Sequence, residues 1–84
     1  MVCKRIIIKG KVQGVFFRVS AKEKADELGI TGEVRNLPDG RVEVVACGDE
    51  ARVQQLIAWC HKGPPRAKVE KVMVNDAPVP GPAL

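Results

Sequence analysis

The sequence predicts an α+β fold: a four-stranded antiparallel sheet with two helices packed on one of its faces. The chain has 84 residues, which suits one domain with one modest core. Four segments are rich in β-branched residues, and two others combine helix-forming residues with apolar side chains at helical spacing. Their order is strand, helix, strand, strand, helix, strand. That order defines the ferredoxin-like βαββαβ sandwich, in which two split βαβ units share one sheet.

The first half of the chain supplies a strand, a helix and a second strand. Residues 2–9 are rich in β-branched side chains and are expected to form the first strand. Strong helix formers fill residues 20–28, with Ser20 as the expected N-cap and Gly29 as the expected stop. Residues 31–36 are expected to form the second strand.

The second half supplies a hairpin partner, a helix and a last strand. The Leu-Pro-Asp-Gly sequence at 37–40 is a turn signal, and the alternating residues 41–47 after it predict the third strand. Asp49 is the expected cap of a helix whose apolar residues recur at i, i+3, i+4 and i+7 over 53–60. Residues 67–75 predict the fourth strand.

Composition narrows the partners and the compartment. The net charge of +4 is mild, and the basic residues are scattered, so nucleic acid is not the expected partner. No apolar stretch is long enough to span a membrane. We do not expect secretion, because we find no charged-then-apolar signal sequence followed by a small-residue cleavage site. We expect a cytoplasmic monomer with one domain over 1–76 and a proline-rich tail over 77–84.

The run from Gly10 to Arg18 predicts an anion site. Gly10 and Gly14 frame a short loop that can turn several backbone N–H groups toward one point. A helix start adds partial positive charge, and Arg18 adds a planar fork of donors just past the loop. Phosphate or sulfate is the expected bound anion.

Asn36 is expected to meet this loop. In a split βαβ unit the first and second strands run in the same direction, so their carboxyl ends lie at one edge of the sheet. Asn36 ends the second strand, and Arg18 follows the first. An asparagine is a poor general base but can orient a water molecule for attack on a phosphoryl group.

What the sequence lacks also indicates the chemistry. No cluster of carboxylates and histidines has metal-ligand spacing, and no cysteine lies near the loop, so we expect no metal and no cofactor. Without a general acid, the site favours a leaving group that needs no proton. The carboxylate released from an acyl phosphate, with a pKa of roughly 4, meets that condition.

Two motifs resemble those of the acylphosphatase family. The run from Gly10 to Arg18 resembles its phosphate-loop signature, and the run from Gly32 to Gly48 resembles its second motif. The resemblance covers residues 2–75 and implies metal-free hydrolysis of an acyl phosphate to a carboxylate and inorganic phosphate. It implies that Arg18 binds phosphate in catalysis and that Asn36 positions the water. It also implies a phosphate-binding loop formed by Lys11, Val12, Gln13, Gly14, Val15, Phe16 and Phe17.

The chain departs from the family pattern in two places. Glu33 stands where the family usually has an aromatic residue. Residues 78–84 are proline-rich where family members usually end in a short strand with an aromatic residue, which leaves the second strand less protected.

The alternative function is a non-catalytic module of the same fold that binds RNA or senses an anion. An RNA-binding domain of this type would carry aromatic residues on its exposed central strands, and none is found there. An anion sensor that keeps Arg18 without hydrolysis stays open.

The three cysteines allow one specific hypothesis. Cys3 starts the first strand and Cys47 ends the third, and these strands are antiparallel neighbours in the expected fold. We therefore expect that Cys3 and Cys47 can form a disulfide, although reducing cytosol opposes it. Cys60 belongs to the helical stripe and should be buried.

Overall fold

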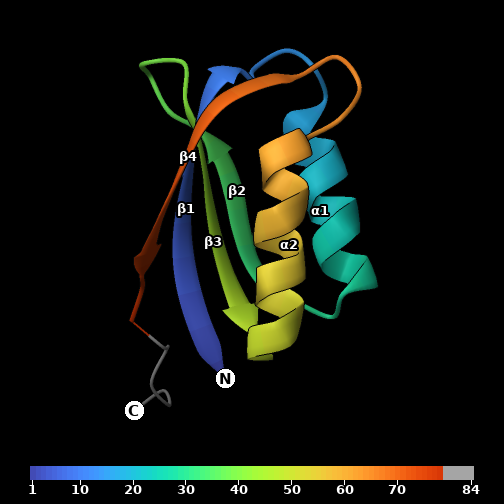
Figure 1. The fold of residues 1–84 in the computed structure, drawn as a ribbon, viewed down its shortest axis with the longest axis vertical. Helices are drawn as coiled ribbons and strands as arrows, with labels where there is room; N and C mark the ends of the chain where they lie inside the picture. Colours follow the sequence, from blue (N-terminus) through green and yellow to red (C-terminus); the bar gives the residue numbers. More distant parts are fainter. Residues whose placement is uncertain (79–84) are drawn as a thin grey trace.

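The computed structural model describes residues 1–78, and the predicted ferredoxin-like fold is confirmed (Figure 1). Of the tail predicted over 77–84, residues 79–84 therefore lie outside the described residues. The elements follow the expected order: β1 (Val2–Lys11), α1 (Phe17–Glu27), β2 (Thr31–Asn36), β3 (Val42–Gly48), α2 (Glu50–Lys62) and β4 (Lys68–Asp76).

The sheet has the strand order β2-β3-β1-β4, and every neighbouring pair is antiparallel. Both helices cover the same face, and β1 and β2 run in the same direction (Figure 1). The loop after β1 and the end of β2 therefore lie at one edge of the sheet, as the fold plan requires. Neither described helix has the length and apolar character that a membrane span needs.

The core lies between the sheet and the two helices. The helix-facing side of the sheet and the inner faces of the helices bury their apolar side chains together. Phe17 at the start of α1 packs on Trp59 of α2, with 5.3 Å between ring centroids. The buried residues with the largest side chains are Phe17, Ile6, Ile8, Leu56, Val12, Val42, Val53 and Cys60.

The start of α1 differs from the prediction. The helix begins at Phe17, and Ser20 lies inside its first turn, where its backbone amide donates to the Phe16 carbonyl at 3.0 Å. A serine cap stabilises a helix by about 1 kcal/mol, whereas burying a phenylalanine contributes about 1.5–3 kcal/mol. Burial of Phe17 therefore outweighs a cap at Ser20, and the helix starts earlier in the sequence, at Phe17. At α2 the expected cap is confirmed, since Asp49 accepts from the Arg52 amide.

The opposite face of the sheet carries polar contacts. Glu43 is 3% exposed and accepts hydrogen bonds from Arg5 at 2.6 Å and from Arg35 at 2.7 Å. The hydrogen bond from Arg5 lowers the pKa of Glu43, burial opposes this shift, and the hydrogen bond from Arg35 lowers the pKa further. The carboxylate thus stays ionised between its two arginines.

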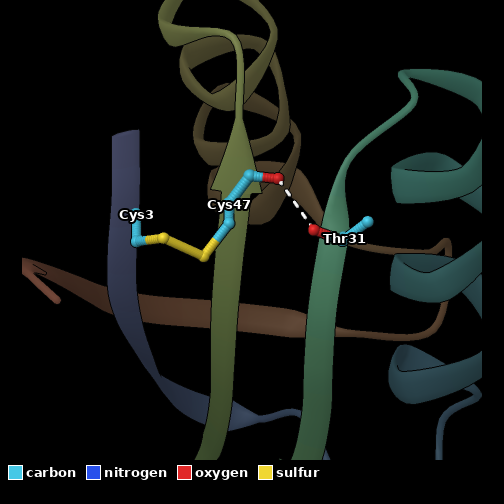
Figure 2. The surroundings of a disulfide bond; sticks show 3 residues. All are labelled: Cys3, Thr31 and Cys47. Atoms are coloured by element: carbon cyan, nitrogen blue, oxygen red, sulfur yellow. Dashed lines mark hydrogen bonds between the residues drawn. A yellow bond between two sulfur atoms is a disulfide. The ribbon is translucent and has the colours of Figure 1, made fainter. Parts of the chain in front are cut away.

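A disulfide joins β1 to β3. Cys3 and Cys47 are directly paired in the strand register, and their sulfur atoms are bonded (Figure 2). The Thr31 hydroxyl of β2 donates to the Cys47 carbonyl at 3.4 Å. Cys60 is free and buried, and desolvation raises the pKa of its thiol to about 12.

Candidate active site

The loop between β1 and α1 has the backbone of an anion cradle. Gly14 has a φ of 71°, and Phe16 has a φ of 64°, the one positive φ of a non-glycine residue within 1–78. A left-handed backbone at a bulky residue is strained and persists where the surrounding structure holds it in place. The amides of residues 13–16 donate no hydrogen bond to any partner within the described chain. They are therefore available to a ligand.

The loop side chains divide into anchors and exposed groups. Val12, Val15 and Phe17 are buried and fix the loop in the core. Lys11, at the end of β1, and Gly14 are exposed, as is Phe16, at 67%. Of the two phenylalanines, Phe17 is thus the core anchor, and Phe16 borders solvent.

Gln13 ties the loop to the β2–β3 hairpin. Its side-chain Nε2 donates to the Leu37 carbonyl at 2.8 Å and to the Arg41 carbonyl at 2.9 Å. Leu37 directly follows Asn36, so this pair of bonds couples the loop to the residue that ends β2. Sequence reasoning placed Gln13 in the cradle but missed this role. The only signal for this role in the sequence is the position of the Gln13 amide side chain between an apolar residue and a glycine.

Arg18 lies in the first turn of α1 and is exposed. That turn contains no acidic residue, the N-cap side chain makes no hydrogen bond, and Arg18 has no ion-pair partner among residues 1–78. A cation at a helix N-terminus is electrostatically unfavourable by itself. A bound anion would satisfy the guanidinium and the helix end together.

Asn36 is the last residue of β2 and pairs with Val42 in the register. Val34 pairs with the buried Val44, so the side chains of Val34 and Asn36 share the face covered by the helices. Asn36 is exposed and its side chain makes no hydrogen bond within the described chain. It is therefore available to water at the edge where the loop lies.

Gly10 shapes the strand that delivers the loop. A β-bulge interrupts the β1–β4 register between Lys9 and Gly10. A Cβ at Gly10 would collide with the Lys68 carbonyl oxygen, and its φ of 137° also favours glycine. Within residues 1–78 no group of three or more histidine, cysteine, aspartate or glutamate side chains could hold a metal ion.

Fold and site describe a small α+β domain that can bind a phosphate-like anion beside an amide able to orient water. The model of the acylphosphatase family matches residues 4–83. An acylphosphatase of Rubrobacter xylanophilus is 54% identical over 77 residues, covering 92% of this chain and 70% of that protein.

Solved structures agree with the sequence comparisons. An acylphosphatase from Coxiella burnetii has a TM-score of 0.91 and 44% identity, covering 98% of this chain and 86% of that chain. The crystal structure of acylphosphatase from Bacillus subtilis has a TM-score of 0.89 and 39% identity, covering 92% of this chain and 86% of that chain. The chain therefore belongs to the acylphosphatase family of hydrolases.

Proposed function

We propose that this chain hydrolyses acyl phosphates to a carboxylate and inorganic phosphate, with Arg18 and the loop over 11–17 holding the phosphate and Asn36 positioning the water. The observation that carries the proposal concerns Arg18 and the loop before it: among residues 1–78, neither the Arg18 guanidinium nor the amides of residues 13–16 have a partner. Family membership supports the reaction itself.

Positioning and electrostatics supply the catalysis in this proposal. The Arg18 guanidinium holds two phosphoryl oxygens, and the loop amides stabilise the charge that builds on these oxygens in the transition state. The oxygen of the water held by Asn36 bonds to phosphorus as the bond to the carboxylate oxygen breaks. The leaving group departs as a carboxylate, and the water proton passes to the phosphate product or to solvent.

The non-catalytic alternatives have less support. RNA binding would use stacked aromatic residues on the outer face of the sheet. That face instead carries the Arg5–Glu43–Arg35 cluster and the disulfide. An anion sensor would share the loop and Arg18, and family membership favours the enzyme over it.

Three further properties belong to the proposal. Inorganic phosphate and sulfate bind at the loop as competitive inhibitors. The protein acts as a monomer. It acts in the cytoplasm, where reducing conditions would keep Cys3 and Cys47 as thiols.

The test is phosphate release from acetyl phosphate in the presence of a chelator. We expect turnover by the wild type and near-complete loss in Arg18→Ala and Asn36→Ala. Arg52→Ala and Asn75→Ala are matched controls: Arg52 lies in the first turn of α2, and Asn75 is exposed on β4. Both controls should keep wild-type turnover. An inactive wild type would defeat the enzyme, and full activity in either site variant would defeat the role of that residue.

A further inference from the structure

Four lysines from two distant parts of the sequence gather at one end of the sheet. The register of β1 and β4 places them in two directly opposed pairs, Lys9 with Lys71 and Lys11 with Lys68. All four residues are exposed. Together they form the lysine cluster.

The strand register fixes the face on which these lysines lie. Ile8 and Val12 alternate with the two lysines of β1 and belong to the core under the helices. On β4, each lysine stands next to a valine, Val69 or Val72, that packs against the same core. Successive side chains of a strand point to opposite faces. The lysine cluster therefore projects from the outer face of the sheet, away from the helices.

None of the four lysines forms an ion pair within residues 1–78. Glu70 lies between the two pairs at the β-bulge and forms no ion pair there either. Arg41 and Asp39 border the same end of the outer face, and they pair with each other. Four ammonium groups against one carboxylate leave the cluster strongly positive. Like charges directly opposite each other in a sheet are destabilising, so the arrangement costs stability.

Protection of a sheet edge explains only half of the lysine cluster. Lysines on an edge strand deter pairing with another chain, and β4 is an edge of the sheet. β1 instead lies between β3 and β4, so Lys9 and Lys11 guard no edge. Their placement indicates a partner of opposite charge outside the fold.

The lysine cluster lies at the edge of the sheet where the proposed phosphate site lies (Figure 1). Lys11 is the first residue of the loop over 11–17, and Lys68 lies across from it at the start of β4. Opposite residues of a sheet are about 5 Å apart, and two residues along a strand cover about 7 Å. Lys68 is thus nearer the loop, and Lys9 and Lys71 lie one step further from it.

We propose that the lysine cluster is an electrostatic guide: its field concentrates phosphate-bearing anions at the loop and lowers KM without taking part in the chemical step. This inference rests on the proposed function, because the guided anion is the acyl phosphate that Arg18 and the loop bind. A positive potential beside a site raises the local concentration and the association rate of anionic ligands. Because the guide acts through charge, it also favours binding of the product, inorganic phosphate.

Charge and distance set the size of the expected effect. A phosphoryl group carries nearly two negative charges at about pH 7 and above. In about 0.01 M salt, one ammonium charge about 10 Å away raises the local concentration of such a dianion about threefold, and one about 15 Å away about twofold. Removing the charges of Lys68 and Lys71 together should therefore lower kcat/KM about fivefold. The effect should vanish in about 1 M salt, where the screening length is about 3 Å.

The first test measures kcat/KM for acetyl phosphate, relative to wild type, against salt concentration in the double variant Lys68→Gln/Lys71→Gln. The matched control, Lys4→Gln/Arg52→Gln, removes as much charge near the starts of β1 and α2, at the end of the molecule away from the loop (Figure 1). We expect the loss at low salt, with kcat unchanged, only in the first double variant. An equal loss in both would show an effect of net charge and would overturn the guide.

A second variant changes kcat/KM in the opposite direction, so misfolding cannot imitate it. Glu70→Gln removes the carboxylate that lies between the lysine pairs and should raise kcat/KM about twofold at low salt. Glu50→Gln, at an exposed position in the first turn of α2, should leave it unchanged. An unchanged or lower kcat/KM in Glu70→Gln would contradict the guide.

The outcomes also separate the guide from the proposed function. Failure of the wild type to hydrolyse acetyl phosphate would defeat the proposed function. Hydrolysis that responds to salt identically in the wild type and in every variant would defeat the guide alone.

Discussion

Gln13 holds the phosphate loop to the hairpin that carries Asn36, so removing its amide should loosen both halves of the site together. Gln13→Ala deletes two hydrogen bonds, of 2.8 Å to Leu37 and 2.9 Å to Arg41. Each neutral bond contributes about 1 kcal/mol, and the half-buried carbonyls would lose a partner. The loss should be about 2 kcal/mol.

This loss has two readouts. If the transition state loses the whole of this stabilisation of about 2 kcal/mol, kcat/KM falls about 30-fold, since about 1.4 kcal/mol corresponds to a factor of ten. For a domain of this size the midpoint of thermal unfolding should fall by roughly 4–8 °C per kcal/mol. Competitive inhibition by inorganic phosphate should weaken as well, because the loop amides lose their fixed position.

The assay for Gln13 is steady-state hydrolysis of acetyl phosphate, with phosphate inhibition and thermal unfolding on the same preparations. Gln55→Ala, at an exposed position of α2, is the matched control and should behave as wild type. A Gln13→Ala variant with lower stability but unchanged kcat/KM and phosphate inhibition would reduce Gln13 to a structural residue. Wild-type values for all three would refute the reasoning.

Three other predictions follow from the same contacts. Arg18→Lys should lose at least a hundredfold in kcat/KM for acetyl phosphate, because an ammonium cannot reproduce the bidentate fork; near-wild-type turnover would contradict this role. The pKa of Glu43 lies below its ordinary value of 4.5, so its contacts contribute stability above that pH, and this stability is lost as pH falls through the folded pKa. Urea titrations at several pH values should therefore show a flatter acid dependence for Glu43→Gln than for the exposed control Glu70→Gln, and identical curves would refute it. Reducing the Cys3–Cys47 bond, which spans 44 residues, should destabilise the protein by up to about 4 kcal/mol in the chain-entropy model. Urea unfolding with and without dithiothreitol tests it, and unchanged stability would contradict a bond present in the purified protein.

Element order could be predicted because local signals and the fold agree. The turn at 37–40, the Asp49 cap and the apolar stripe of α2 each specify their own neighbourhood. The topology of split βαβ units then brings Asn36 to the edge of the sheet where the loop lies.

The start of α1 and the role of Gln13 could not be predicted, because both depend on contacts between segments that are distant in the sequence. Ser20 looks like a helix cap, but the packing of Phe17 on Trp59, 42 residues away in sequence, moves the helix start. The two bonds of Gln13 reach across 24 and 28 residues and leave no periodic pattern to detect.

The central claim is that water attacks the phosphorus held by the loop and Arg18, and isotope-labelled water tests it most directly. Hydrolysis of acetyl phosphate by the wild-type protein in ¹⁸O-water breaks either the bond to phosphorus or the bond to the carbonyl carbon. We predict that the label from water appears in inorganic phosphate and that the released acetate carries none. Label in the acetate would show attack at the carbonyl carbon and would contradict the roles assigned to Arg18 and Asn36.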